Sequence, residues 1–274
     1  MLVTRGDLDP ERLAGTLTTR RLGRPYLFLA SCGSTNDEVA ARAAAGAPEG
    51  LLLAADQQTR GRGRRGRAWH SPAGENLCFS LLLRPALAAE QVAPLALAAG
   101  SALARALEGL GLGFRPLLKW PNDVLLDGVE GPRKVAGILA EMASQRGQVR
   151  HLVLGVGINV NSREFAADLA GQATSLALVG GKSLDRLSVL TSFLAAFEPL
   201  YQEFVAHGPG AALELWRRFA RFGQPCRIEL DGDDCDGIAE GVDETGALLV
   251  RTGGGTLLPI HAGDVSWSMS RAVL

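Results

Sequence analysis

The stretch Gln58-Thr-Arg-Gly-Arg-Gly-Arg-Arg-Gly-Arg67 stands between two apolar runs, residues 50–55 and 77–83. Short apolar runs bounded by glycine or proline are typical of buried strands. The residues between them, 57–74, then form a long loop that interrupts a sheet. We call this segment the arginine loop.

The composition of the arginine loop predicts an anion-binding site. Arg60, Arg62, Arg64, Arg65 and Arg67 place five guanidinium groups within eight residues, and the intervening glycines expose backbone N–H groups. Because like charges repel, we expect the loop to be mobile when empty and ordered by a bound phosphate or carboxylate. A solvated loop and an RNA-binding tract are the alternatives. The segment also matches G-x-G-x-x-G, but no helix follows it as a dinucleotide site requires.

The segments around the loop predict an α+β domain with a mixed or antiparallel sheet and flanking helices. Strands are expected at 26–31, 50–55, 77–83, 117–120, 124–126, 135–142 and 152–160, and helices at 34–45, 92–110, 184–207 and 211–222. Five short runs follow, at 227–230, 238–242, 247–251, 256–260 and 265–268, and suggest a small barrel. We therefore divide the chain into an irregular N-terminal segment (1–24), a main domain (25–223) and a small β-domain (224–274).

The composition is that of a globular protein and excludes several classes. The chain has 274 residues, 47% of them hydrophobic, which suits one large domain with or without an appendage. Its net charge of -1 excludes a general attraction to nucleic acids or anionic membranes. The most apolar stretch, 92–107, is interrupted by Pro94 and Arg105 and is too broken for a membrane span. Four cysteines without CxxC spacing, and an N-terminus without an apolar run, lead us to expect a cytoplasmic protein.

Three familiar motifs are incomplete. Asp231-Gly-Asp-Asp-Cys-Asp-Gly237 resembles a calcium loop but has Asp236 where glycine is required, so we expect a polar hairpin turn. Gly181-Lys182-Ser183 ends like a phosphate-binding loop, but Leu176 replaces its first glycine. The four histidines are remote from one another in the sequence, which argues against a zinc site.

Lysine is nearly absent, which draws attention to the lysines that remain. Of the 28 basic residues, only Lys119, Lys134 and Lys182 are lysines. Lys119 opens Lys119-Trp-Pro-Asn-Asp123, and Lys134 opens Lys134-Val-Ala-Gly-Ile-Leu139. Lysine supplies a compact, flexible point charge that differs from the planar guanidinium fork. These two lysines are therefore candidates for a charged site.

Small residues in three further segments predict a narrow slot. Gly137 and Gly155 lie inside predicted strands, where glycine often marks the close approach of a ligand. Ser34-Thr-Asn36 begins the first helix of the main domain. These residues either cap that helix, since Thr35 to Glu38 fits a capping box, or offer hydrogen bonds to a planar amide or urea group.

Taken in order, Ser34-Thr-Asn36, the arginine loop with Trp69, residues 119–123, residues 134–139 and Gly155-Val-Gly-Ile-Asn159 resemble the biotin-protein ligases. The resemblance covers residues 25–270. It implies a catalytic domain like that of class II aminoacyl-tRNA synthetases, followed by an SH3-like β-barrel, which agrees with the boundary near residue 223. It also implies an enzyme that joins biotin to ATP, giving biotinyl-5′-adenylate and pyrophosphate, and then transfers biotin to one lysine of a biotin carboxyl carrier domain.

The resemblance also implies roles for individual residues. Ser34, Thr35, Asn36 and Gln58 would hold the biotin head group, and Gly137 and Gly155 would line its slot. Arg62, Gly63 and Arg64 would hold the biotin carboxylate and the adenylate phosphate, while Arg64, Arg65, Arg67, Trp69, Asn122 and Asn159 would contact the nucleotide. Lys134 would bridge carboxylate and phosphate as the main catalytic residue, with Arg64, Lys119 and Asp123 beside it. Asp123 is also a candidate magnesium ligand.

Such roles suit the chemistry, because a carboxylate that attacks a phosphate brings two anions together and cations must cancel their repulsion. Magnesium would neutralise the departing pyrophosphate. About 24 residues precede the first strand, too few for the DNA-binding domain of the family's repressors, so we expect no DNA binding. A homodimer is expected from the resemblance alone. The alternative functions are a lipoate or octanoate ligase and a non-catalytic RNA-binding module.

Overall fold

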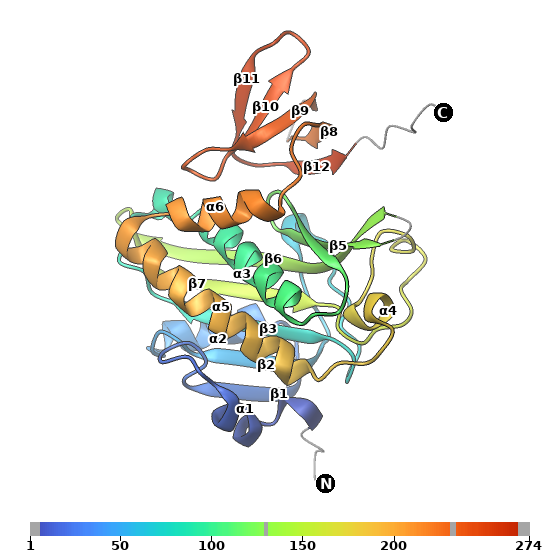
Figure 1. The fold of residues 1–274 in the computed structure, drawn as a ribbon. Coiled ribbons are helices and arrows are strands. Elements are labelled where there is room, and N and C mark those ends of the chain that lie inside the picture. The colour runs from blue at the N-terminus through green and yellow to red at the C-terminus, as the bar shows by residue number, and fades with distance from the viewer. Residues whose placement is uncertain (1–5, 129–130, 231–233, 268–274) are drawn as a thin grey trace.

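The computed structural model describes residues 6–128, 131–230 and 234–267, and two sheets dominate it (Figure 1). The main sheet has seven strands in the order β1-β2-β3-β7-β6-β5-β4. Their bounds are β1 Tyr26–Cys32, β2 Leu52–Gln58, β3 Leu77–Leu83, β4 Arg115–Lys119, β5 Asp123–Gly128, β6 Gly131–Gln145 and β7 Gln148–Ile158. Only β1 and β2 pair in parallel among these strands, so the sheet is mixed, as predicted.

Helices cover both faces of the main sheet. Helices α3 (Leu95–Gly109), α5 (Arg186–His207) and α6 (Gly210–Phe219) pack on one face, and α2 (Thr35–Ala44) packs on the other (Figure 1). Side chains alternate along β2 accordingly, since Leu52 and Ala54 join the larger core cluster while Leu53 joins the cluster under α2. This double burial explains why β2 and β3 read as continuous apolar runs.

The apolar stretch at 92–107 forms the central helix of the protein. It corresponds to α3, which lies between the sheet and the helices α5 and α6, so residues on nearly every side of it are buried. A helix surrounded in this way needs no polar face. Among the described residues, no helix is long and apolar enough to span a membrane.

Several elements differ from the sequence predictions. The segment 1–24 is not wholly irregular, because it contains the short helices η1 (Gly6–Leu8) and α1 (Pro10–Thr16). The signal for α1 was present: Asp9 caps it by accepting a hydrogen bond from the Glu11 backbone, and proline occupies its first position. Strands β6 and β7 extend past the apolar residues into an exposed, polar hairpin, so periodicity alone ended them too early. Helix α4 (Leu176–Gly180) and the single turns η2 (Arg64–Gly66) and η3 (Ala89–Gln91) were not predicted either.

The C-terminal residues form a separate antiparallel sheet, as predicted. Its five strands are β8 Gln224–Glu229, β9 Cys235–Val242, β10 Leu248–Thr252, β11 Leu257–Ile260 and β12 Asp264–Trp267, in the order β11-β10-β9-β8-β12. No pairing between β11 and β12 closes a barrel within the described residues. The incomplete calcium motif follows β8 and ends inside β9, which pairs with β8 as a hairpin; residues 231–233 of the motif lie outside the described residues.

Candidate active site

A cavity of about 1350 Å³ lies between the arginine loop, the main sheet and the C-terminal sheet. It brings together almost all of the residues that the sequence singled out. Its lining includes Ser34, Thr35, Asn36, Gln58, Arg62, Gly63, Arg64, Arg67, Trp69, Lys119, Asn122, Asp123, Lys134, Gly137, Gly155 and Asn159. Arg65 is the exception, because it lies outside the lining and turns toward the C-terminal sheet, where its guanidinium donates to the Glu229 carbonyl at 3.4 Å.

The start of α2 forms a polar corner of this cavity. Ser34 occupies the N-cap position but makes no side-chain cap hydrogen bond, and Thr35 bonds to Gln58 instead of capping the helix. The Thr35 backbone N–H and its hydroxyl both donate to Gln58 Oε1, at 2.8 and 3.1 Å. The capping box, one of the two alternatives for this segment, is therefore not formed. The Thr35 side chain is held by Gln58 and Ser80, and both Thr35 and Gln58 line the cavity.

Asn36 is fixed by its neighbours on both sides. Its Oδ1 lies 2.6 Å from the buried hydroxyl of Ser80, and its Nδ2 donates to Glu141 Oε2 at 2.6 Å. A Cβ at Gly155 would lie 2.2 Å from Asn36 Oδ1. Gly155 is therefore needed to admit the Asn36 side chain, which is a different reason for glycine than direct contact with a ligand.

Trp69 covers the floor of the cavity. A Cβ at Gly157 would lie 2.4 Å from the Trp69 ring, and one at Gly137 would lie 3.3 Å from it. The two glycines thus allow an indole to lie flat against β6 and β7. Trp69 Nε1 is buried and has no hydrogen-bond partner among the residues that the structure describes. A ligand atom that accepts from this N–H would relieve a costly unsatisfied donor.

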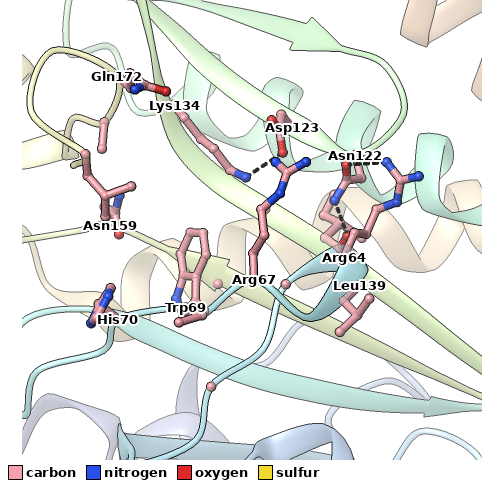
Figure 2. Close-up of a pocket in the computed structure, with 18 of the residues that line it drawn as sticks. Arg64, Arg67, Trp69, His70, Asn122, Asp123, Lys134, Leu139, Asn159 and Gln172 are labelled. Carbon is pink, nitrogen blue, oxygen red and sulfur yellow. Dashed lines mark hydrogen bonds and ion pairs between the residues drawn. The ribbon is translucent and has the colours of Figure 1, made fainter. Parts of the chain in front are cut away.

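Asp123 lies between two lysines: it pairs with Lys134 of β6 (Figure 2) and stands opposite Lys119 in the pairing of β4 with β5. Lys134 Nζ lies 2.7 Å from Asp123 Oδ1 and 5.7 Å from the centre of the Trp69 ring. Burial lowers the pKa of Lys119; the nearby charge of Asp123 opposes this shift, and that of Lys134 adds to it. The two ammonium groups therefore reinforce a positive field at this wall of the cavity.

Acidic side chains pair with four of the five arginines of the loop in this structure. Arg62 makes two hydrogen bonds to Asp37, at 2.6 and 3.0 Å. Arg64 donates to Asp264 Oδ1 at 3.1 Å, and Arg67 forms an ion pair with the same carboxylate. Burial lowers the pKa of Arg64, and its arginine neighbours add to that shift. The repulsion expected within the loop is thus reduced by two carboxylates, and one of them, Asp264, lies 200 positions away from Arg64 in the sequence.

The two asparagines of the predicted nucleotide site are anchored to backbone groups. Asn122 Nδ2 donates to the Ile138 carbonyl at 2.8 Å, and its Oδ1 accepts from Arg64 at 3.4 Å (Figure 2). Asn159 Nδ2 donates to the Thr174 carbonyl at 3.1 Å. Both side chains line the cavity, so each also shapes its wall.

Sequence reasoning missed several residues of the site. Ser80 is a lone polar residue inside the apolar run 77–83, and that interruption was a usable signal. Asp264 and Trp267 line the cavity from the C-terminal sheet, and nothing local in the sequence marks them. His70 and Gln172 also line it (Figure 2).

The residues that the structure describes do not form a cage for a metal ion. No group of three or more histidine, cysteine, aspartate or glutamate side chains lies close enough together in those parts of the chain. Asp123 is engaged by the Lys134 ammonium. The magnesium role of Asp123 stays a prediction that this donor set does not favour, and ATP commonly carries magnesium on its own phosphates.

Comparison with known proteins relates these features to a family. The model of the Biotin/lipoate A/B protein ligase family matches residues 31–159, and that of the Biotin protein ligase C terminal domain matches residues 222–267. The "Biotin--[acetyl-CoA-carboxylase] ligase" of Mycobacterium tuberculosis is 37% identical over 268 residues, which span 95% of this chain and 96% of that protein. The bifunctional ligase/repressor BirA of Bacillus spizizenii is 35% identical, over 95% of this chain and 79% of its own length.

A solved structure agrees with the sequence matches. The biotin protein ligase from Aquifex aeolicus, in complex with biotin and ATP, superposes with a TM-score of 0.75 and 30% identity, over 89% of this chain and 98% of that one. The fold and the two matching models thus define a biotin/lipoate ligase domain followed by a biotin ligase C-terminal domain. Since the identity to the mycobacterial ligase extends over nearly all of both proteins, the chain belongs to the biotin protein ligase family.

Proposed function

We propose that this protein is an ATP-dependent ligase that attaches biotin to a carrier protein in two steps. In the first, an oxygen of the biotin carboxylate attacks the α-phosphorus of ATP, the bond to the β-phosphate breaks, and pyrophosphate leaves with the electron pair. In the second, the amine of a carrier lysine attacks the acyl carbon of biotinyl-5′-adenylate, AMP leaves, and the amine loses a proton. The product is an amide.

One observation carries this proposal: cations from three distant segments line a single cavity. Arg62 and Arg64 come from the arginine loop, Lys119 from β4 and Lys134 from β6. Two anionic reactants repel each other, so their encounter requires positive groups on several sides. In an RNA-binding module we would expect the arginines to be spread over a surface, but here Arg62 and Arg64 line the same cavity as two lysines and are paired with carboxylates.

The positions of the residues in the cavity suggest which part of the reactants each residue binds. We infer that Ser34, Thr35, Asn36 and Gln58 bind the ring system of biotin, and that Ser80 and Glu141 hold Asn36 in place for it. Lys134 would exchange Asp123 for the biotin carboxylate and the α-phosphate. Arg64, Arg67 and Asn122 would bind the nucleotide, with Trp69 and Asn159 shaping its pocket. Closure by the arginine loop would exclude water from the mixed anhydride.

The partner that this chemistry requires is a biotin carboxyl carrier domain with an exposed lysine. We propose a cytoplasmic location, which the four free thiols of the chain support. Magnesium would enter with ATP. The homodimer stays a prediction, as does the division into domains at residue 223.

The direct test supplies the purified protein with labelled biotin, ATP, magnesium and a carrier domain. We expect the label on the carrier only when ATP is present and only on the intact target lysine, so a carrier with that lysine replaced by arginine is the control. An unlabelled carrier, with no pyrophosphate released, would overturn the proposal. Competition between biotin and lipoate or octanoate for adenylate formation distinguishes the related ligases, and we expect biotin to prevail.

A further inference from the structure

The C-terminal sheet supplies a carboxylate to the arginine loop. Asp264 is the first residue of β12, its side chain is 17% exposed, and it lines the cavity. Its Oδ1 lies 3.1 Å from Arg64 Nη1, and its Oδ2 lies 3.6 Å from Arg65 Nη1. Oδ2 also forms the ion pair with Arg67. One carboxylate thus contacts three guanidinium groups.

Backbone groups reinforce this contact. The Gly263 carbonyl accepts from both Nη1 and Nη2 of Arg64, each at 3.2 Å, and the Glu229 carbonyl accepts from Arg65 at 3.4 Å. A Cβ at Gly263 would lie 2.8 Å from the Ile228 side chain, so the turn before Asp264 packs tightly on β8. Asp264 is therefore presented by rigid backbone, unlike the long, mobile side chains of an ordinary surface ion pair.

The carboxylate contacts cations that we assign to the phosphates of the nucleotide. Two of its three partners, Arg64 and Arg67, line the cavity and are the cations we assign to the nucleotide. A carboxylate and a phosphate present the same kind of oxygen acceptors to a guanidinium fork. Three cations against one carboxylate leave an excess of positive charge, so the cluster still attracts an incoming polyphosphate.

We propose that Asp264 is an internal counter-ion that holds the loop arginines in the empty enzyme and is displaced by the phosphates of the nucleotide. This inference rests on the proposed function, because it takes ATP as the incoming anion. Nucleotide binding then loosens the contact between β12 and the arginine loop. Coupled equilibria are reciprocal: if nucleotide binding weakens the contact of Asp264 with the arginines, that contact weakens nucleotide binding by an equal factor. For couplings of this kind the factor is about fivefold or more.

The test compares Asp264→Asn with the native protein and with Asp234→Asn. Asp234 is the matched control, because it pairs with Arg227 at 2.7 Å in the same small domain and does not line the cavity. Binding of ATP and of inorganic pyrophosphate is measured by calorimetry without biotin. We expect Asp264→Asn to bind both anions about fivefold more tightly or better, with unchanged binding of biotin alone, and Asp234→Asn to behave like the native protein.

Unchanged or weaker anion binding by a folded Asp264→Asn protein would overturn the inference. A second measurement does not depend on the variant: amide hydrogen exchange of residues 263–267 in the native protein, with and without ATP. Faster exchange with ATP supports displacement of Asp264, and slower or equal exchange contradicts it. If the native protein bound neither biotin nor ATP, the proposed function itself would fail; if it bound both and only the Asp264 results disagreed, the inference alone would fail.

Discussion

At the scale of single residues, Lys134 shows how the fold positions a charged side chain in the cavity. Its ammonium lies 2.7 Å from Asp123 and above the Trp69 ring, so two neighbours fix its position. The sequence could identify it because lysine is almost excluded from the chain. It could not identify the pairing with Asp123, which depends on the register of β5 against β6.

We expect Lys134→Ala to slow adenylate formation about 100-fold or more, because one positioned charge is lost where negative charge accumulates. Biotin binding should change much less. Pyrophosphate release in a single turnover measures the first effect, and calorimetric binding of biotin measures the second. Lys182→Ala removes an exposed lysine outside the cavity and is the control. Native single-turnover rates in the Lys134 variant would exclude this role.

Gly155 offers a second prediction at this scale. Its Cβ in Gly155→Ala would lie 2.2 Å from Asn36 Oδ1, and Asn36 cannot move freely because Ser80 and Glu141 hold it. We expect a stability loss of about 1–3 kcal/mol and biotin binding about tenfold weaker. Gly241→Ala is the control, since nothing lies within 4 Å of a Cβ there. Equal biotin affinities in both variants would show that Asn36 can relocate without consequence.

The polar corner shows what local sequence leaves undecided. Ser34-Thr-Asn36 suited both a helix cap and a recognition site, and the hydrogen bond from Thr35 to Gln58 decides against the cap. That partner is contributed by β2, which becomes a neighbour only through its parallel pairing with β1. Local patterns could therefore propose both roles, and tertiary structure selects one.

At the scale of elements, a buried arginine fixes both ends of the arginine loop. Arg186, at the start of α5, donates to Asp56 at 2.7 Å and to the Asn76 carbonyl at 3.0 Å. These residues flank the loop, and Asp56 also accepts from the Gly74 backbone. Asp7, from the N-terminal segment, completes the cluster with a contact of 2.6 Å. The N-terminal residues thus help to hold the base of the site.

We expect Arg186→Met to destabilise the protein by about 3–5 kcal/mol, because it leaves two partly buried carboxylates without their cation. Denaturant-induced unfolding measures the loss. Arg12→Met breaks the exposed pair with Asp185 next to it and should cost about 1 kcal/mol or less. Similar, small losses in both variants would show that the cluster contributes little to stability.

The same cluster predicts how stability depends on pH. Burial raises the pKa of Asp7, but its hydrogen bonds and charge interaction with Arg186 outweigh burial and hold that pKa below its ordinary value of 3.8. The unfolded chain therefore binds this proton at a higher pH than the folded protein does. The stabilisation is complete above the unfolded pKa and is lost as the pH falls through the folded one. The free energy of unfolding of Asp7→Asn should be lower than native at neutral pH, with the gap narrowing below about pH 4; a constant gap would contradict this.

At the scale of the whole molecule, the site is built by two sheets that fold from different parts of the chain. The periodicity of residues 224–267 predicted the strands of the second sheet, because alternation and turn residues are local signals. It could not predict that Asp264 contacts Arg64, since that contact joins residues 200 positions apart at the place where the C-terminal sheet borders the cavity. Such long-range ionic contacts have no local signature.

Arg64 joins the two sheets at the cavity, and we expect it to help retain the biotinyl-5′-adenylate intermediate there. Its guanidinium bonds to Asn122, between β4 and β5 of the main sheet, and to Gly263 and Asp264 at the start of β12. We expect Arg64→Gly to retain adenylate about tenfold less well, since a hydrogen bond to a charged group contributes roughly 1.5–3 kcal/mol. The variant should still form adenylate, release it, and label bystander proteins as well as the carrier.

The test measures two quantities: the free adenylate in solution and the label on an added albumin. Arg227→Gly, which removes an exposed arginine paired with Asp234 outside the cavity, should keep its label on the carrier. If Arg64→Gly were equally selective, another group would close the cavity over the mixed anhydride.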